Sequence, residues 1–342
     1  MVNPLTALSV GLILIAIFVF VFIPNKGILA RIYKSRRINK RVLIEDALKH
    51  LYNNEYNSIG STLNSIAGNL SIPADDAAEL ITKLEAMGLV SSSGNNLQLT
   101  TEGRTYALKI IRVHRLWEKY LADETGIDEL EWHTSAEKIE HSMSPEQANE
   151  LAAQIGNPVF DPHGDPIPSS KGDLPIKKGR PLSELKPGEF ASIIHIEDEP
   201  LAIYTQLVAE GLYPGMQVRM LEYGHERVRF TANGEECILA PLFVKNITVA
   251  TVKNEIKIDK KLRRLSSLGI GESGKVLAIS KSCRGQQRRR LMDLGVVPGT
   301  EITAELRSAG GDPTAYKIKE ASIALRKKEA DKIFLIPEEV DE

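Results

Sequence analysis

Two histidines and two glutamates stand at helical spacing in the segment 132–146, WHTSAEKIEHSMSPE. They are His133, Glu137, Glu140 and His141, at positions i, i+4, i+7 and i+8. Side chains at these positions of an α-helix share one face. Imidazoles and carboxylates make a poor apolar core, but they are the mixed nitrogen and oxygen ligands that divalent transition metals take. The spacing therefore predicts a metal site on this helix.

The preceding helix carries the same chemistry. His114 and Glu118 repeat the i, i+4 arrangement within a helix expected over 105–125. A single His–Glu pair on a charged helix is more often a solvated surface feature than a pair of ligands. Six such residues on two successive helices favour metal binding over a solvated face.

Composition excludes several other kinds of site. The 342 residues suffice for two or three domains, and a net charge of −2 indicates no charged partner by itself. Cys237 and Cys283 lie far apart, so neither a disulfide framework nor an all-cysteine zinc site is expected. An enzyme is not expected either. The HExxH motif is absent, and the phosphate-loop spacing at 269–275 is followed by Val276 in place of serine or threonine.

The N-terminal segment 5–24 is uncharged and long enough to span a bilayer. It lacks both a preceding basic residue and a small-residue cleavage site, which favours an uncleaved anchor over a signal peptide. Seven basic residues and no acidic one follow at 26–41, which is typical of the cytoplasmic flank of a span and of contact with anionic lipids. The prediction is a single-pass protein of the cell membrane, with an anchor over 1–25, a basic juxtamembrane linker over 26–41 and soluble domains in the cytoplasm.

Helical periodicity and turn residues divide the next part of the chain into two regions. Residues 42–110 predict three helices and a hairpin, the plan of a winged helix-turn-helix, over 42–52, 61–70, 73–87, 89–90 and 97–99. Residues 111–168 predict a helical domain, in which helices over 129–142 and 145–155 follow the long helix. A linker rich in Pro, Gly and Lys is expected over 169–180.

The last part of the chain contains a repeat. LSELKPGE at 182–189 matches LSSLGIGE at 265–272, and a Leu-x3-Gly-x2-Pro-Gly pattern recurs at 207–215 and 291–299. A period of about 84 residues, with β-forming stretches after each Pro-Gly turn, predicts two small β-barrels in tandem over 181–252 and 260–337. Basic residues surround the helix of the second repeat, for which an anionic partner, a membrane face and a solvated helix are alternatives: Lys281, Arg284, Arg288, Arg289 and Arg290.

With these motifs, residues 42–168 resemble the DtxR/MntR family of metal-dependent transcription regulators. The matching segments are LEAMGLV at 84–90, LQLTTEGR at 97–104, VHRLWEKYL at 113–121, the histidine and glutamate run, and DPHGDPIP at 161–168. The repeats resemble FeoA-type (SH3-like) domains, most clearly through QRRRLMDLGVVPGTEI at 287–302. The expected fold is multidomain α+β: a transmembrane helix, a winged helix-turn-helix, a helical metal-binding and dimerisation domain, and two SH3-like β-barrels.

The resemblance implies a homodimer that binds Mn(II) or Fe(II). Its primary ligands would be Asp46, His114, Glu137, Glu140 and His141, and an ancillary site would use Glu118, His133 and Glu199. A carboxylate at Glu137 resembles the manganese branch of the family, whereas the iron branch has cysteine there. The manganese branch can add a second carboxylate three residues after Asp46. Because this chain has Lys49 there, a single primary metal ion is expected.

The same resemblance implies DNA contacts from Asp76, Glu79, Lys83, Ser61 and Thr62. The expected recognition helix is acidic, however, and residues 42–110 contain eight acidic and four basic side chains, whereas DNA affinity depends on lysine and arginine. Two alternative functions therefore fit the sequence. The first is a membrane-anchored, Mn(II)- or Fe(II)-responsive transcription regulator of metal homeostasis that binds a DNA operator. The alternative is a membrane-tethered metal sensor that does not bind DNA and regulates a ferrous iron transporter through its FeoA-type domains.

Overall fold

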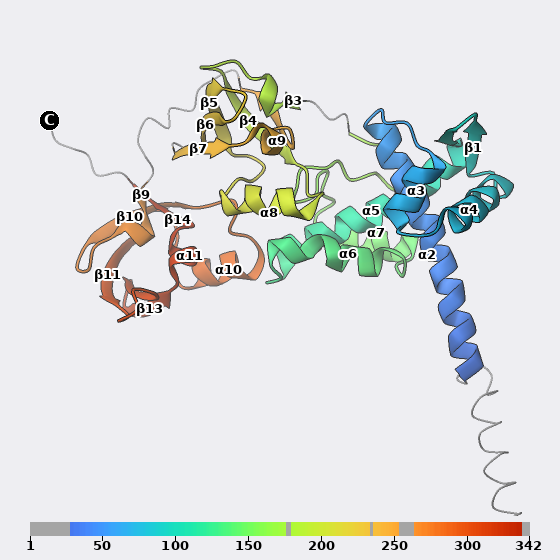
Figure 1. The fold of residues 1–342 in the computed structure, drawn as a ribbon. Helices are drawn as coiled ribbons and strands as arrows, with labels where there is room; N and C mark the ends of the chain where they lie inside the picture. Colours follow the sequence, from blue (N-terminus) through green and yellow to red (C-terminus); the bar gives the residue numbers. More distant parts are fainter. Residues whose placement is uncertain (1–27, 176–178, 233–234, 253–262, 337–342) are drawn as a thin grey trace, which may run out of the picture. The chain divides into compact units, whose positions relative to one another are not determined.

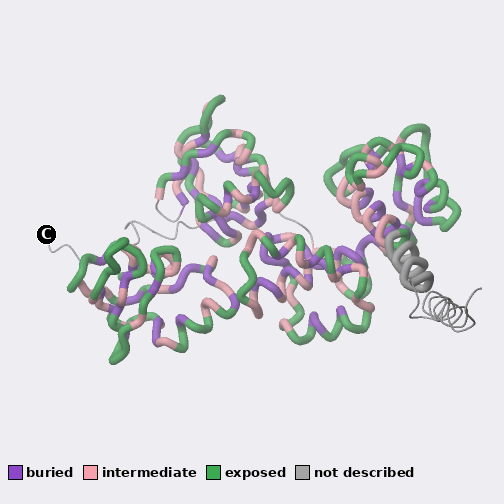
Figure 2. The backbone as a smooth tube through the Cα atoms, turned by 60° about the horizontal axis from the view of Figure 1, so that its bottom comes forward, coloured by how far each residue is buried: buried purple, intermediate pink, exposed green. Residues whose placement is uncertain are grey.

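The computed structural model describes residues 28–175, 179–232, 235–252 and 263–336 (Figure 1). The chain divides into two compact units, the first ending at Ile111 and the second beginning at Arg112. Each unit has its own buried residues, drawn in purple in Figure 2.

The predicted membrane location has to be corrected. Among the described residues, no helix is both long and apolar enough to cross a bilayer. The apolar segment 5–24, on which the prediction depended, lies outside the described residues. The single-pass anchor and the location derived from it are therefore not retained.

The first unit contains the predicted three helices and hairpin. The elements are α2 (Ile28–Tyr56), α3 (Leu63–Leu70), α4 (Ala74–Ala86), β1 (Val90–Ser93) and β2 (Asn96–Leu99). Since α2 begins at Ile28, most of the basic segment 26–41 is helical and is continuous with the first expected helix. The fully buried Leu48, Leu51, Ile66 and Leu84 come from α2, α3 and α4 and form the core of this unit.

The helical part of the second unit begins within a long helix, α5 (Thr101–Glu124), which continues from the first unit. A short 3-10 helix, η1 (Glu129–Glu131), leads into α6 (Trp132–Glu140), and α7 (Pro145–Gln154) follows. The predicted helix 129–142 is thus two elements, and His141 stands at the C-cap of α6. Val113, Leu116, Leu151 and Ile167 pack together and fix α5 against α7.

Two antiparallel sheets of six strands make up the rest of the second unit. The first is formed by β3 (Arg180–Pro181), β4 (Phe190–Ile196), β5 (Gln217–Tyr223), β6 (Val228–Ala232), β7 (Glu235–Leu239) and β8 (Ile247–Thr251), with η2 (Leu182–Glu184), α8 (Leu201–Ala209) and α9 (Pro241–Val244). The second is formed by β9 (Arg263–Arg264), β10 (Ser273–Ile279), β11 (Glu301–Arg307), β12 (Thr314–Ile318), β13 (Ala321–Leu325) and β14 (Ile333–Leu335), with η3 (Leu265–Ser267), α10 (Gly285–Asp293) and α11 (Lys327–Ala330).

The two sheets have the same strand order, β3-β8-β4-β5-β6-β7 in the first and β9-β14-β10-β11-β12-β13 in the second. Each encloses a separate hydrophobic core. The repeat seen in the sequence is therefore a repeat of structure. Closed barrels are not confirmed, because the strand pairing of the described residues forms open sheets.

Candidate metal centre

His114 is the central residue of a buried cluster on α5. Its Nδ1 lies 2.5 Å from Glu140 Oε2, and its Nε2 lies 3.0 Å from Glu118 Oε1. The side chains of His114, Glu118 and Glu140 are 6%, 2% and 1% exposed. Burying charged groups costs free energy unless they are paired, so this arrangement requires either protons or a cation between the carboxylates and the imidazole.

On the Nδ1 side, His114 belongs to what we call the Glu140 cluster, made of His114, Glu140 and His141. The Nε2 atom of His141 lies 3.4 Å from Glu140 Oε1. Glu140 ends α6 and His141 follows it as the C-cap, so neighbouring positions in the chain present a carboxylate and an imidazole to the same region. Three of the predicted primary ligands thus converge within the second unit.

On the Nε2 side lies what we call the Glu118 cluster, made of Glu118, His133, His163 and Asp198. The Nδ1 atom of His133 is 3.3 Å from Glu118 Oε1 and 2.9 Å from Asp198 Oδ2. The Nε2 atom of His163 is 4.0 Å from Glu118 and 3.9 Å from Asp198. One ligand atom from each of Glu118, His163 and Asp198 fits within a span of 4.8 Å.

The chemistry of His163 fits a metal ligand. Its Nε2 atom is buried and, among the described residues, has no hydrogen-bond partner. A buried polar atom without a partner is rare, and the two facing carboxylates are too far away to bond to it directly. A divalent cation between the three groups would satisfy all of them.

The four residues of 132–146 are divided between two clusters. Helical periodicity places them on one face, but His133 and Glu140 are seven residues apart, or about 10 Å along the axis at 1.5 Å per residue. One ion cannot bridge that distance. His133 therefore joins the Glu118 cluster, while Glu140 and His141 form the other cluster.

The remaining three predicted ligands are Glu137, Glu199 and Asp46. Glu137 is 50% exposed, and its carboxylate is 3.5 Å from His133 Nε2. Glu199 is 63% exposed and 3.3 Å from the same nitrogen, so it stands at the outer side of the Glu118 cluster. Asp46 is half-buried on α2, in the first unit, and it remains a predicted ligand.

Sequence reasoning missed His163 and Asp198. His163 lies in DPHGDPIP, a segment of turn residues that carries part of the family resemblance. Asp198 stands beside Glu199 in the loop before α8, and the structure places it closer to His133 than Glu199. A histidine within a motif of turn residues was the one available signal.

Charges within the Glu118 cluster shift its protonation equilibria. Burial alone would raise the pKa of Glu118, but the charge of His114 and hydrogen bonds from His114 and His133 hold that pKa well below its usual range. Burial would lower the pKa of His133, but hydrogen bonds to Asp198 and Glu118 raise it far above its ordinary value. Burial would raise the pKa of Asp198, but the hydrogen bond from His133 and the charge of His163 together lower it. Protons thus hold the cluster together, and a metal ion must displace some of them to bind.

The loop that carries His163 is organised by Asp161. Its Oδ1 accepts hydrogen bonds from the backbone N–H groups of His163, Gly164 and Asp165, at 2.9, 2.9 and 2.8 Å. Burial, followed by the charges of nearby carboxylates, raises the pKa of Asp161 to about 7. The side chain therefore acts mainly as an acceptor that holds the loop in place.

Asp161→Ala is expected to lower the free energy of unfolding by about 3 kcal/mol, because it leaves buried backbone donors without an acceptor. Asp161→Asn keeps an acceptor oxygen and is expected to cost less than about 1 kcal/mol. Chemical denaturation of the two variants in parallel measures the difference. Equal losses would show that the carboxylate charge, and not the acceptor oxygen, holds the loop.

The predicted DNA contacts lie in the first unit. Three are on the exposed face of α4: Asp76, Glu79 and Lys83. Thr62 is exposed, but its hydroxyl caps α3 by accepting a hydrogen bond from Ser65 N at 3.2 Å. Ser61 is 1% exposed and its hydroxyl accepts a hydrogen bond from Asn54. The structure does not support Ser61 as a DNA contact, because its side chain is engaged inside the unit.

Three helices with a hairpin, followed by helices that gather buried histidines and carboxylates, define a winged-helix protein with a metal-binding helical domain. Comparison with known proteins identifies the family within this class. Residues 100–169 match the model of the iron dependent repressor, metal binding and dimerisation domain, and residues 263–337 match the FeoA domain.

Three relatives illustrate the similarity. The iron-dependent repressor IdeR of Mycobacterium tuberculosis is 32% identical over 211 residues, which cover 57% of this chain and 90% of the relative. A structure described as a manganese-dependent transcriptional repressor complex with manganese has a TM-score of 0.57 and 28% identity, and the match covers 61% of this chain and 100% of that one. A probable metal transport system membrane protein of Chlamydia trachomatis is 40% identical over 81 residues, or 24% of this chain and 18% of the relative.

The chain belongs to the DtxR/IdeR/MntR family of metal-dependent transcriptional repressors. This confirms the family predicted from the sequence and the presence of a FeoA domain. Since the relatives are iron- or manganese-dependent repressors, the expectations of Mn(II) or Fe(II) and of a protein that is not an enzyme are also confirmed.

Proposed function

We propose that this protein is a homodimeric repressor that binds a DNA operator when Mn(II) or Fe(II) is bound. The observation that carries the proposal is the buried group of imidazoles and carboxylates around His114. The ion would be held by the Glu140 cluster, with Asp46 as a further oxygen ligand. Glu137 would have to move toward this cluster to serve as the predicted ligand, because its carboxylate lies beside His133.

A second ion would be held by the Glu118 cluster, through Glu118, His163 and Asp198, with His133 and Glu199 at its outer side. Carboxylate oxygens combined with imidazole nitrogens suit Mn(II) and Fe(II) alike. Each ion would supply the positive charge that fixes the surrounding carboxylates. The unpartnered nitrogen of His163 supports this second centre.

The two centres give the metal a way to change DNA affinity. A ligand shifts a conformational equilibrium only when it binds one state better than the other. An ion that takes Asp46 from α2 together with Glu140 and His141 would favour one position of the winged helix. In a homodimer, such a restriction would set the spacing of two recognition helices on DNA.

A second candidate function is a metal sensor that acts on a metal transport protein through its FeoA-type domains and does not bind DNA. The exposed carboxylates on α4 favour it, because they repel phosphates. The similarity to a probable metal transport system membrane protein is also in its favour.

Binding of genomic DNA fragments to the protein decides between the two functions. The protein is incubated with and without Mn(II) or Fe(II) at fixed salt, and metal content is measured on the same sample. Enrichment of a discrete sequence only with metal supports the operator-binding repressor. Bound metal without retained DNA at low salt contradicts it and favours the sensor.

The acidic recognition helix gives a further expected result. Asp76→Thr combined with Glu79→Gln is expected to strengthen DNA binding at least about tenfold at low salt, because it removes two charges that repel phosphates. Electrophoretic mobility shift with operator and with unrelated DNA measures the change. The matched control is Glu85→Gln, an exposed position on the same helix. An unchanged affinity in the double variant would mean that α4 does not face DNA.

A further inference from the structure

The second repeat contacts the helical metal-binding domain at the end of α5. The N–H group of Gln286, at the start of α10, donates to the carbonyl oxygen of Thr125 at 3.2 Å. The backbones approach so closely that a Cβ on Gly285 would lie 2.1 Å from Thr125 O, and Gly285 has φ +55°. A glycine is therefore required at this point by both space and conformation.

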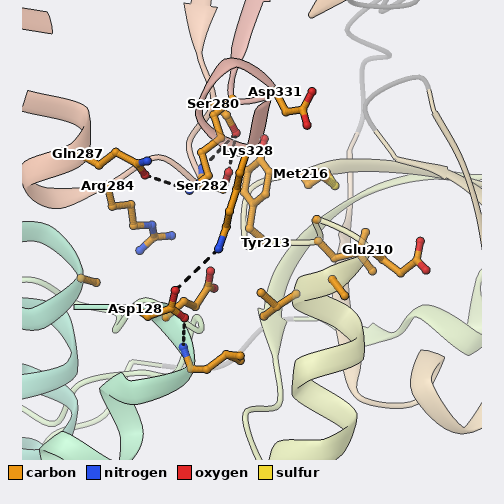
Figure 3. Close-up of a pocket in the computed structure, with 18 of the residues that line it drawn as sticks. Asp128, Glu210, Tyr213, Met216, Ser280, Ser282, Arg284, Gln287, Lys328 and Asp331 are labelled. Atoms are coloured by element: carbon orange, nitrogen blue, oxygen red, sulfur yellow. Dashed lines mark hydrogen bonds and ion pairs between the residues drawn. The ribbon is translucent and has the colours of Figure 1, made fainter. Parts of the chain in front are cut away.

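Charged groups extend this contact on both sides. The Arg289 guanidinium pairs with the Glu124 carboxylate and donates to the carbonyl oxygen of Asp123 at 3.3 Å. Lys328 Nζ lies 3.9 Å from Asp128 Oδ2, and a dashed line joins the two side chains in Figure 3. Two elements of the second repeat, α10 and α11, thus meet the segment 123–128.

The contact joins the C-terminal end of α5 to the N-terminal end of α10, and these two ends attract each other. The last carbonyl groups of α5 and the first N–H groups of α10 have no partner within their own helices. The ends of the two helices carry opposite partial charges and attract each other. Arg284, the N-cap of α10, provides no side-chain cap, so the carbonyl of Thr125 satisfies one donor of that helix. The exposed ion pairs add little free energy. Their main effect is to fix how α10 and α11 are aligned with the segment 123–128.

The first repeat uses the equivalent segment in the same way. With the offset of 84 residues between α8 (Leu201–Ala209) and α10 (Gly285–Asp293), the loop that carries Asp198 and Glu199 corresponds to residues 282–283. In the first repeat this loop contacts His133 of the helical domain. In the second repeat, Arg284 donates to the carbonyl oxygen of Pro162 at 3.5 Å, beside His163. Both repeats therefore dock through the start of the same helix.

We propose that the second FeoA-type domain is an intramolecular latch on the metal-binding domain, and that its docking and metal occupancy stabilise each other. The latch contacts the C-terminal end of α5 and the loop of His163. The same helix carries His114 and Glu118. A domain docked on both elements holds the ligands of the Glu118 cluster in place. The docking itself follows from the contacts above, and only its coupling to metal rests on the proposed function.

Hydrogen exchange of the full-length protein tests the latch. Gly285→Asn keeps a residue that tolerates positive φ but places a side chain against Thr125. We expect at least tenfold faster exchange at the last turn of α5 and the first turn of α10. The matched control is Gly311→Asn, a glycine of the same domain with φ +87° and nothing within 4 Å of an added Cβ, and its exchange there should equal that of the unmodified protein. Equal exchange in both variants overturns the docking.

A charge swap gives a second test that does not depend on the glycine. Arg289→Glu or Glu124→Arg alone should increase exchange at the same amides, and the two together should restore protection. A double variant no more protected than the single variants contradicts the contact.

The coupling between docking and metal is tested separately. Gly285→Asn should weaken Mn(II) binding at least threefold in calorimetry. An unchanged Mn(II) affinity overturns the coupling and leaves the docking intact. Failure of the unmodified protein to bind Mn(II) overturns the coupling together with the proposed function, and the exchange result is independent of both.

Discussion

His114→Ala is expected to lower the affinity for Mn(II) by more than about a hundredfold, a larger loss than the removal of a group that only orients a ligand. The reason is that one imidazole serves both clusters. Its two nitrogens lie 2.5 Å from Glu140 and 3.0 Å from Glu118. Isothermal titration calorimetry with Mn(II), at a pH where the protein is folded, measures the loss.

The matched control for this variant is His195→Ala. His195 is also a buried histidine of the second unit, and its Nε2 lies 3.2 Å from the carboxylate of Asp165, outside both clusters. Its removal should leave Mn(II) affinity within about threefold of the unmodified value, because His195 neither binds the ion nor orients a ligand. Loss of a group that orients a ligand would cost at least about tenfold. Comparable losses in the two variants would mean that burial of any histidine, and not ligation by His114, accounts for the effect.

Glu118→Ala is expected to lower the free energy of unfolding of the metal-free protein by about 3–5 kcal/mol, the usual cost of removing one partner from a buried ion pair. Glu118 is 2% exposed and contacts His114 and His133. Its loss removes a carboxylate that both imidazoles share and leaves each with fewer counterions in a buried site. Urea unfolding in the presence of a chelator measures the change.

The control for Glu118 is Glu137→Ala, which removes a carboxylate from the same group of residues at a position 50% exposed. Exposed ion pairs contribute little, so a loss below about 1 kcal/mol is expected. If the two variants are equally destabilised, the buried carboxylate is not the counterion of the cluster.

The contribution of Glu118 also has a defined pH dependence. Its pKa in the folded protein is lower than the ordinary value of 4.5. The folded state therefore binds its proton more weakly than the unfolded state, and the stabilisation is complete above the ordinary pKa. It is lost as the pH falls through the lower folded pKa. The stability difference between the unmodified protein and Glu118→Ala should shrink in that acidic range.

The helical part of the fold could be predicted because apolar periodicity is a local signal. The helix expected over 105–125 is α5 at Thr101–Glu124, and that expected over 145–155 is α7 at Pro145–Gln154. The repeat in the sequence likewise predicted two domains of one design, and their strand order is the same. Barrel closure could not be predicted, because it depends on pairing between edge strands, which alternation of β-forming residues does not encode.

The candidate site could be predicted only in part, for a related reason. Spacing along a helix shows which residues share a face, but it does not show at which height along the axis a ligand sits. The spacing places Glu137 on one face with both His133 and Glu140, and only the structure shows that its carboxylate lies beside His133. Asp198 and His163 come from a loop before α8 and a loop after α7, and their approach to Glu118 depends on tertiary packing that local patterns do not contain.

The position of His114 between two carboxylates has one more consequence. A neutral imidazole has two ring nitrogens but a single N–H group. When an ion takes Nδ1 beside Glu140, the proton remains on Nε2 and is donated to Glu118, as metal-bound histidines usually donate to a carboxylate. A second ion could take Nε2 only from an imidazolate, which is far harder to form. His114 would thus be a ligand on one side and a hydrogen-bond donor on the other, so the ion of the Glu118 cluster would be held by Glu118, His163 and Asp198 without His114.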